Sequence, residues 1–491
     1  MIIENRTNSV GGKKIVVLGG GFAGLRIAYL LDKLGYSISL IEKSKNLGGM
    51  VQTFSHSYEG EQFHFDFGPH LFFDDYISEY RDLLGDSMIS IVDRFCMCTA
   101  ESIFTYPLRP LEILTRTNPV TSMGYLLDFL IDRVRPQGTD GGDDNLDAFL
   151  IKRFGRRLFN KFYAPYIKKC CGLNPGQVSY LWAKERENVS GKGLWENLSK
   201  KLRALLSSKT RQELARVNDP SSSNITAWYP RLGSGQLCDA MATALRDQDV
   251  YLNSTVKRVN IKDQSIQDVV VDVDRKERVI KGDYYISTLP LPYLFECLQP
   301  VSPLLAATTR RLKYRSVRLV CLIVDRERLL DCLEMFSMDR RHIFKRVYEP
   351  KAMSNSMSPK GKSSLCLEVC CNGDDDIAAM PPDKLASRCV NDLITMQLLR
   401  SPDEVRDFFV IEMPQAYPIY SKGFEQDRQK LLDQIAGFDN LLTCGRQGLF
   451  RYHAMTNEVM EMADRVVHFI DHGRDKRVAD STRSQWGRPY Y

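Results

Sequence analysis

The sequence feature that most constrains the fold is the unit at residues 13–50, KKIVVLGGGFAGLRIAYLLDKLGYSISLIEKSKNLGGM. A short β-branched run at residues 15–18 is typical of a buried strand in a parallel sheet. A G-x-G-x-x-G sequence follows, then a helical apolar pattern that Gly35 ends, then a second strand pattern at 37–41 that ends at Glu42. This order of strand, glycines, helix, strand and acid predicts a Rossmann-type unit that binds a dinucleotide.

Each glycine of this turn has a mechanical reason. Gly19 allows the tight turn, Gly21 lets the backbone approach a pyrophosphate, and Gly24 lets the helix pack on the strand. The helix N-terminus presents free N–H groups to the phosphates. Glu42 comes where a carboxylate can accept hydrogen bonds from ribose hydroxyls, and it would repel a 2′-phosphate, so NADP is a poor candidate. We expect Phe22, Ala23 and Lys43 to line the same site.

A second pair of glycines follows the acid and separates the possible cofactors. Gly48 and Gly49 are followed by Met50, and then by Gln52 and Thr53. This stretch resembles the second glycine pair of the FAD-dependent amine oxidase and protoporphyrinogen oxidase superfamily, where it continues the FAD site. The resemblance implies FAD as a resident cofactor, in preference to NAD, with Gly49 and Met50 among its contacts.

The bulk properties describe an ordinary globular protein and exclude several classes. With 491 residues, 43% apolar and 26% charged, the chain has room for about three domain-sized units. The net charge of +6 is mild for this length, so we expect no nucleic-acid partner. The thirteen scattered cysteines show neither a disulfide framework nor metal-ligand spacing, so we expect no metal and a reducing cytoplasm. We find no signal peptide and no transmembrane run.

The strand and helix patterns predict an α/β fold, and the resemblance to the superfamily implies that its FAD domain is discontinuous. We expect a Rossmann-type FAD-binding domain of the glutathione-reductase-2-like (GR2-like) kind, formed by residues 1–75, 226–292 and 410–475. Residues 76–225 and 293–409 would form a helical and a mixed α/β substrate region, and residues 476–491 a flexible tail. The pattern further predicts strands or a hairpin at 51–67, strands at 318–324 and 364–371, and a helix from about residue 457.

Four further stretches resemble the UDP-galactopyranose mutase-like branch of that superfamily. They are FDFGPHLFF at 65–73, FTYPLRPLEIL at 104–114, the stretch 154–186, and the closing stretch 416–455 with its CGRQGLFRYHAM sequence. The resemblance implies that a Gly68-Pro69-His70 turn places an imidazole beside the flavin. It also implies that Gly445, Arg446 and Met455 belong to a C-terminal FAD motif, with Val256 contributing from the middle segment.

The closing motif departs from the mutase pattern at two positions. Mutases carry there a tyrosine that contacts the substrate diphosphate and, four residues later, an aspartate; this chain has Phe450 and Ala454. A phenylalanine can pack but cannot donate a hydrogen bond. The turn also reads Leu71-Phe72-Phe73 where mutases often have another histidine. These departures favour a relative that acts on another substrate.

The resemblance assigns the remaining site residues, and each has a structural alternative. His70, Arg451 and Tyr452 are the candidate catalytic residues, although His70 could be a hydrogen-bonded turn histidine. Arg446 is expected near FAD phosphate or the flavin, and could instead be an ordinary charge at a strand end. The candidate substrate contacts are Arg186, Tyr417, Tyr420 and Phe450, of which the two tyrosines are equally compatible with a core position.

These features predict an FAD-dependent oxidoreductase that acts on a polar small molecule, sugar-like or nucleotide-sugar-like. One alternative is a non-redox nucleotide-sugar mutase that uses reduced FAD, with Arg446, Arg451 and Lys168 as cations for the leaving diphosphate. A second alternative is a non-catalytic flavoprotein. The expected partner is a small-molecule substrate, and homo-oligomers are possible.

Overall fold

The structure is a computed structural model that describes residues 12–92, 94–99, 102–106, 110–134, 145–185, 226–245, 248–300, 302–452 and 455–472. The predicted tail at 476–491, the candidate substrate contact Arg186 and the departure at Ala454 lie outside the described residues.

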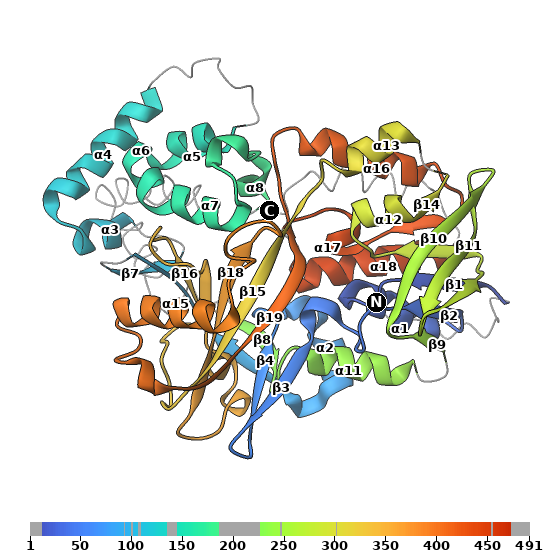
Figure 1. The fold of residues 1–491 in the computed structure, drawn as a ribbon, viewed down its shortest axis with the longest axis horizontal. Helices are drawn as coiled ribbons and strands as arrows, with labels where there is room; N and C mark the ends of the chain where they lie inside the picture. Colours follow the sequence, from blue (N-terminus) through green and yellow to red (C-terminus); the bar gives the residue numbers. More distant parts are fainter. Residues whose placement is uncertain are drawn as a thin grey trace, which may run out of the picture.

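A five-stranded parallel sheet forms one half of the molecule (Figure 1). Its strand order is β20 (Leu441–Thr443), β13 (Tyr284–Ser287), β1 (Lys14–Leu18), β2 (Ser37–Ile41) and β9 (Asp249–Tyr251). Every neighbouring pair in this sheet is parallel. Three helices, α1 (Phe22–Lys33), α11 (Gly235–Ala244) and α18 (Thr456–His472), pack with it. The predicted α/β fold class with a Rossmann-type domain is therefore confirmed.

The sheet combines segments that lie far apart in the chain. Its adjacent strands β20, β13 and β1 begin at residues 441, 284 and 14. Three predicted domain bounds nevertheless cut through packed structure. The bound at 75 precedes α2 (Ile77–Leu84), whose Tyr80 is buried in the same core as α1. The bound at 410 falls inside β19 (Val405–Pro418), which pairs with β15 (Tyr314–Val324). The bound at 292 falls inside α12 (Leu291–Cys297). At these three points the packed units differ from the predicted segments.

A four-stranded sheet adjoins the parallel sheet. It consists of β12 (Lys276–Ile280), β11 (Ser265–Val273), β10 (Ser254–Lys262) and β14 (Leu298–Gln299), in that order. Helix α12 (Leu291–Cys297) packs on β10 and on α13 (Pro303–Thr309), which in turn packs on α16 (Phe424–Ala436). Helix α16 also contacts β20, and α17 (Gly445–Gly448) contacts α18. This sheet brings the start of β10 beside the end of β2, since Ser254 N–H donates to the Glu42 carbonyl at 2.9 Å.

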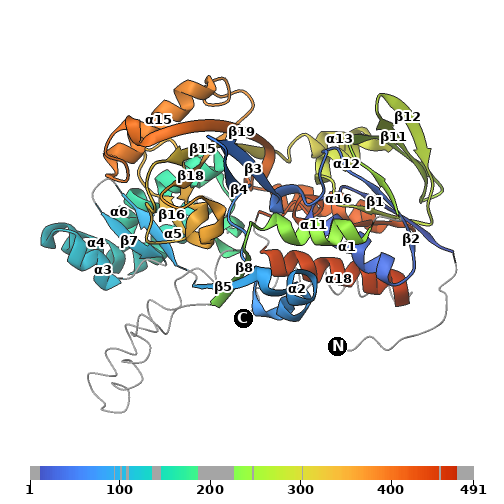
Figure 2. The same cartoon turned by 90° about the horizontal axis from the view of Figure 1, so that it is seen from below.

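A seven-stranded mixed sheet forms the other half of the molecule (Figures 1 and 2). Its order is β19, β15, β18 (Ser363–Cys371), β17 (Arg346–Tyr348), β16 (Glu334–Ser337), β6 (Phe95–Cys98) and β7 (Ile103–Tyr106). Helix α15 (Pro382–Thr395) covers one face, and the hairpin of β3 (Thr53–Tyr58) and β4 (Glu61–Asp66) covers the other. Strand β18 is buried along its whole length, including its charged residue Glu368.

A group of helices lies at one end of the molecule (Figure 1). It comprises α3 (Pro110–Arg116), α4 (Pro119–Val134), α5 (Leu146–Phe154), α6 (Arg156–Leu158), a π-helical turn (Phe159–Tyr163), α7 (Ala164–Cys171) and α8 (Leu181–Lys184). Between the halves, β5 (Met88–Val92) pairs with β8 (Thr226–Pro230). Short 3-10 turns lie at Gly49–Val51, Asp74–Tyr76, Gly85–Ser87, Pro175–Gln177, Asn355–Met357 and Pro402–Glu404.

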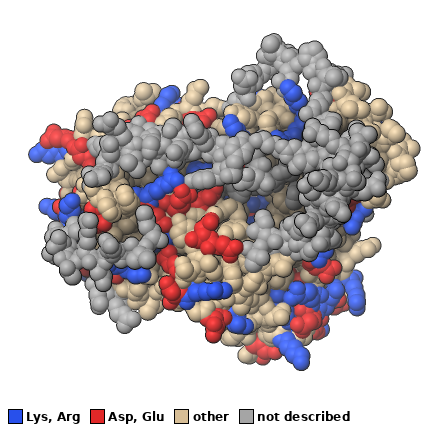
Figure 3. All heavy atoms as spheres, turned by 180° about the vertical axis from the view of Figure 1, so that it is seen from behind, with Lys and Arg blue, Asp and Glu red and all other residues tan. Residues whose placement is uncertain are grey.

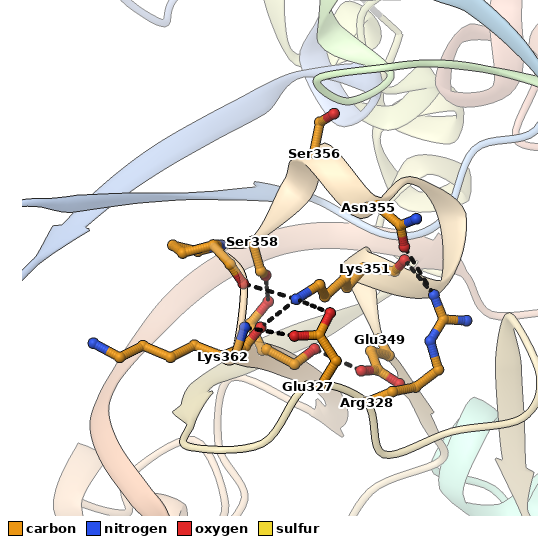
Figure 4. A network of polar contacts seen from close by, with 12 residues as sticks. Glu327, Arg328, Glu349, Lys351, Asn355, Ser356, Ser358 and Lys362 are labelled. Atoms are coloured by element: carbon orange, nitrogen blue, oxygen red, sulfur yellow. Dashed lines mark hydrogen bonds and ion pairs between the residues drawn. The ribbon is translucent and has the colours of Figure 1, made fainter.

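A buried polar network holds the connection between β17 and β18, which includes α14 (Pro350–Met353) (Figure 4). The Lys351 ammonium donates to the carbonyls of Pro359 and Lys362 at 2.7 Å and pairs with Glu327 at 2.8 Å. The Glu349 carboxylate accepts from the Leu330 N–H at 2.7 Å. The buried charges of Lys351 and Glu349 are therefore paired or hydrogen-bonded, which avoids the cost of burying them alone and stabilises the connection that precedes β18.

The surface charge is mixed. On the face seen in Figure 3, basic and acidic side chains of the described residues are interspersed, in line with the mild net charge of +6. None of the helices in the described part of the chain is both long enough and apolar enough to span a bilayer.

Candidate active site

The glycine turn after β1 leaves an open space at the N-terminus of α1. Gly19 has φ +100°, and its N–H donates to the Ile41 carbonyl at 2.8 Å. A Cβ on Gly24 would lie 1.9 Å from the Gly19 carbonyl oxygen, so this glycine is required by packing. A Cβ on Gly21 would meet no protein atom within 4 Å. Gly21 therefore borders space that a pyrophosphate can occupy, against the free N–H groups of α1.

Glu42 is held in position by two backbone donors. Its side chain is 8% exposed, and its two carboxylate oxygens accept from the Gly20 and Ser44 N–H groups, each at 2.8 Å. Each oxygen keeps a further lone pair for a ribose hydroxyl. Val256 lies two residues beyond Ser254, which donates to the Glu42 carbonyl, so it is near this end of the site. Lys43 is exposed beside Glu42.

The second glycine pair packs directly on the first turn. The Gly48 N–H donates to the Gly20 carbonyl at 2.8 Å, and a Cβ on Gly49 would lie 3.0 Å from the Gly21 Cα. Both glycines have positive φ, +105° and +58°, which explains their residue type. Met50 follows them and is half-buried, while Phe22 and Ala23 are buried in the first turn of α1.

Thr288 supports the glycine turn and was not among the sequence predictions. Its hydroxyl donates to the Leu18 and Gly19 carbonyls at 3.1 and 2.9 Å. The signal for it was its position directly after β13, since adjacent parallel strands end at the same edge of a sheet.

The C-terminal motif approaches α1 from the other side. Gly445 has φ +78°, and a Cβ there would lie 2.8 Å from the Ala23 Cβ. Arg446 donates one Nη2 bond to the Ala416 carbonyl at 2.7 Å, and its buried Nε has no partner among the described residues. The neighbouring Gln447 likewise has a buried Oε1 without a partner. Met455 is 38% exposed at the start of α18.

His70 lies on a turn that is anchored by the hydrogen bonds of Asp66. Asp66, the last residue of β4, is buried and accepts from the Tyr229 hydroxyl at 2.5 Å, and its carbonyl accepts from Tyr348 at 2.7 Å. Gly68 has φ +127°, so the chain turns sharply before Pro69. The His70 Nδ1 is buried and has no partner among the described residues.

The surroundings of His70 keep its imidazole neutral. Burial lowers its pKa to about 4, and the positive charges of Arg346 and Arg446 act in the same direction. The Gly68 backbone and the negative charge of Glu368 raise the pKa but do not outweigh these effects. A neutral imidazole can accept a proton at neutral pH, which the protonated form cannot.

A buried cluster of four charged residues stands next to this turn. Arg346 pairs with Glu334 at 2.6 Å and with Glu368, and Lys345 pairs with Glu368 at 2.9 Å. The register places Arg346 opposite Glu368 on adjacent strands β17 and β18. A Cβ on Gly68 would lie 3.4 Å from Glu368 Oε1 and 3.8 Å from His70 Cε1. None of the four was among the sequence predictions, because only strand pairing brings them together.

Glu368 is ionised despite its burial. Burial by itself would raise its pKa, but Arg346 and Lys345 outweigh that effect and lower the pKa to about 2. The pKa values of Lys345 and Arg346 are raised well above their ordinary values by the facing carboxylates, against the opposing effect of burial. Glu368, Lys345 and Arg346 are therefore charged across the ordinary pH range, whereas burial raises the pKa of Glu334 against the opposing effect of Arg346.

Tyr417 connects the charge cluster to the C-terminal motif. Its ring lies under the Lys345 ammonium at 3.6 Å and the Arg446 guanidinium at 4.6 Å, measured to the ring centroid. Its hydroxyl donates to Glu368 at 3.2 Å, and its ring stacks on Tyr452 at 5.2 Å. The structure thus joins Tyr417, Tyr452 and Arg446 in one contact group, which includes the charged neighbours of His70.

Tyr420 and Phe450 lie in the protein core, which corrects their prediction as substrate contacts. Both are 0% exposed. The Tyr420 hydroxyl donates to Glu185 at 2.8 Å and accepts from the Tyr452 N–H at 2.9 Å. Phe450 packs edge-on against Tyr314. Arg451 is half-buried. Burial raises the pKa of Glu185, and the positive charge of Arg451 acts to lower it.

FAD fits the residues that surround this space. The opening at Gly21 and the carboxylate of Glu42 suit a pyrophosphate and a ribose, and the unpartnered polar atoms of Arg446, Gln447 and His70 suit the flavin end. The fold and the site together define a Rossmann-type flavoenzyme.

The chain belongs to the flavin containing amine oxidoreductase family, whose family model matches residues 22–445. It is an FAD-dependent enzyme of that family, and the predicted superfamily and cofactor are confirmed.

Curated relatives match only parts of the chain. A carotenoid phi-ring synthase from Chlorobaculum tepidum is 44% identical over 64 residues, 13% of this chain and 10% of that protein. A probable UDP-galactopyranose mutase from Klebsiella pneumoniae is 23% identical over 181 residues, 34% of this chain and 44% of that protein. The chain thus spans less than half the length of either relative.

Solved structures match nearly the whole chain. Reduced UDP-galactopyranose mutase superposes with a TM-score of 0.79 at 18% identity, covering 98% of this chain and 100% of that one. A putative protoporphyrinogen oxidase from Exiguobacterium sp. 255-15 gives 0.68 at 15% identity, covering 94% and 100%. At these identities the likeness shows the fold.

Proposed function

We propose that the enzyme is an oxidoreductase that removes a hydride from a C–H bond next to oxygen or nitrogen in a polar, sugar-like or nucleotide-sugar-like molecule. The observation that carries this proposal is the neutral His70, whose buried Nδ1 has no partner among the described residues, beside the proposed flavin position. Bound FAD supplies the two-electron acceptor for the hydride. The protein must then accept one proton from the substrate.

His70 is the residue we assign to that proton. As the hydride leaves the carbon, the O–H or N–H on the same carbon loses its proton to the imidazole, and a C=O or C=N bond forms. Dioxygen or another electron acceptor then takes the two electrons from the cofactor. Arg446, Tyr417 and Tyr452 would orient a polar substrate, since they form one contact group with the cluster next to His70.

The charge pairing supports redox chemistry over displacement of a diphosphate. A mutase needs cations for its leaving diphosphate, but Lys345 and Arg346 are each paired with buried carboxylates. Lys168, which the sequence suggested for this role, is exposed on α7. Phe450 is in the core and offers no hydroxyl.

The decisive test is anaerobic mixing of FAD-loaded enzyme with a panel of sugars, nucleotide sugars, amines and amino acids. We expect one class to remove the visible absorbance of oxidised flavin and to yield a product two electrons more oxidised. If chemically reduced enzyme alone isomerises one of these compounds, with no net electron flow, the proposal is wrong and the enzyme is a mutase. The similarity to a probable UDP-galactopyranose mutase over 181 residues is the observation that favours this second candidate.

Replacing His70 with alanine should retain FAD but lower the rate of flavin reduction by roughly 10²–10⁴-fold, the usual contribution of a general base. The matched control is His64→Ala on β4, the strand before the His70 turn, where the ring contacts the Ser55 hydroxyl at 2.9 Å. That variant should reduce flavin at the normal rate. Rapid anaerobic reduction kinetics measure both, and a normal rate for His70→Ala would leave His70 as a packed turn residue only.

A further inference from the structure

The His70 turn, which runs from Asp66 to Phe72, is fixed at both ends to strand β8. At its start, the Asp66 carboxylate accepts a hydrogen bond from the Tyr229 hydroxyl at 2.5 Å. At its end, Phe72 exchanges two backbone hydrogen bonds with Trp228, at 3.0 and 2.7 Å. Because Trp228 and Tyr229 are consecutive residues of β8, both ends of the turn have the same support.

The Asp66 carboxylate also reaches the glycine segment of the proposed FAD site. Thr53 follows the second glycine pair, and its hydroxyl donates to Asp66 at 2.5 Å and accepts from the Gly235 N–H at 2.8 Å. The Ser234 N–H, directly before α11, lies 3.2 and 3.3 Å from the two Asp66 oxygens and donates to them. One buried side chain thus joins the segment after the second glycine pair, the start of α11 and the His70 turn.

The groups that hydrogen-bond to this carboxylate in the described part of the chain are all donors. They are the hydroxyls of Thr53 and Tyr229 and the N–H of Ser234. An ionised carboxylate can accept from each of them, whereas a protonated carboxyl would place its own O–H among groups that donate. The network as it stands therefore needs Asp66 in its ionised form.

Burial opposes this ionised form. It raises the pKa of Asp66 from 3.8 to about 6, although the hydrogen bonds just described act to lower that pKa. The other titratable groups packed around Asp66 are Tyr229, Tyr348 and Cys238, and burial raises the pKa of each, so they stay neutral. Among the described residues of this network, Asp66 is therefore the one whose charge changes near pH 6.

We propose that Asp66 is a positioning residue whose ionised carboxylate holds the His70 turn against the segment that follows the second glycine pair. It would thereby set where His70 lies relative to FAD. This inference rests on the proposed role of His70 as the base, and it assigns Asp66 no contact with the substrate or the cofactor. A displacement of about 1 Å can lower a rate by roughly a hundredfold. Loss of the Asp66 charge should therefore slow the reaction without removing the cofactor.

The first test compares Asp66→Asn with the unchanged protein, both loaded with FAD and mixed anaerobically with the compound that reduces the flavin. Asparagine keeps the side-chain size, but only its one oxygen can accept hydrogen bonds. We expect the flavin content and the folded structure to be retained. The maximal rate of flavin reduction should fall about ten- to a hundredfold, with the half-saturating concentration nearly unchanged. In the unchanged protein this rate should decline as the pH falls through about 6, and in Asp66→Asn it should not.

A spectroscopic measurement tests the same inference without any substrate. Visible circular dichroism of bound FAD responds to the groups packed around the flavin. We expect a transition near pH 6 in the unchanged protein that is lost in Asp66→Asn. Tyr229→Phe removes a donor that lowers the Asp66 pKa, so this variant should reduce flavin more slowly and its transition should move to higher pH.

The matched controls are Tyr36→Phe and Asp471→Asn. The buried Tyr36 donates its hydroxyl to Asp471 at 3.1 Å, so these two residues repeat the tyrosine–aspartate pair away from the His70 turn. Neither control should change the rate or the transition.

A normal rate with an unshifted transition in Tyr229→Phe overturns the proposal, and this holds even if Asp66→Asn fails to fold. The same pattern in a folded Asp66→Asn overturns it as well. The spectroscopic transition does not depend on the reaction. Its loss in Asp66→Asn, combined with a normal rate for His70→Ala, would support Asp66 as a positioning residue and reject only the assignment of His70 as the base.

Discussion

Replacing Gly21 with valine is expected to give a folded protein that no longer retains FAD. The backbone at Gly21 has φ −63°, which any residue adopts, and a Cβ there meets no protein atom within 4 Å. The valine side chain would instead fill the space that we assign to the pyrophosphate. We expect FAD affinity to fall by roughly a hundredfold or more, equivalent to about 3 kcal/mol. The amount of flavin that remains with the protein after gel filtration measures the effect.

Two other glycines make this prediction specific. Gly373→Val places the same side chain in open space elsewhere and should keep full flavin content. Gly24→Val forces a Cβ to within 1.9 Å of the Gly19 carbonyl, so it should lose folded structure as well as FAD. Circular dichroism separates loss of the fold from loss of the cofactor. A Gly21→Val protein with normal flavin content would show that the cofactor lies elsewhere.

Neutralising Glu368 should destabilise the protein more than any other conservative change at the site. Glu368→Gln keeps the side-chain size but leaves the buried Lys345 and Arg346 with Glu334 as their remaining partner in the cluster. Loss of one partner from a buried ion pair typically costs about 3–5 kcal/mol. Urea unfolding of the FAD-loaded protein should therefore show a markedly lower midpoint. The His70 pKa should fall further, because Glu368 opposes the effect of the two arginines on it.

The matched control is Glu277→Gln on β12. Glu277 pairs with Arg258 at 3.2 Å, and the two side chains are 62% and 44% exposed, so its loss should cost about 1 kcal/mol or less. A Glu368 variant no less stable than the Glu277 variant would contradict the ionised cluster.

The stability difference between the unchanged protein and Glu368→Gln should depend on pH with a definite sign. The folded-state pKa of Glu368 is about 2, below its ordinary value of 4.5. Its stabilising effect is therefore complete above pH 4.5 and is lost as the pH falls toward 2. Urea unfolding at a series of acidic pH values should show the two proteins converging over that range.

The cofactor half of this protein was predictable from local sequence patterns. The strand, glycine turn, helix, second strand and Glu42 lie within about 30 residues, and their contacts are local. Gly24 must be glycine because the Gly19 carbonyl five residues earlier leaves no room for a Cβ. A local pattern therefore carried enough information to predict the fold class and a dinucleotide site, and the family resemblance of Gly48 and Gly49 added the choice of FAD. The hairpin at β3 and β4 was predictable for the same reason, since its strands are joined by a short turn.

Only the tertiary structure decided the surroundings of His70. Arg346 and Glu368 lie on the paired strands β17 and β18, almost 300 residues after Gly68 in the chain. The fold nevertheless places both side chains next to the Gly68 turn. Tyr420 and Phe450 are buried because distant helices and strands pack over them, which their residue types did not reveal. Burial and the distance between charges set whether a carboxylate is ionised and whether an imidazole can accept a proton. Both quantities depend on contacts between distant segments, so they exist only once the chain has folded.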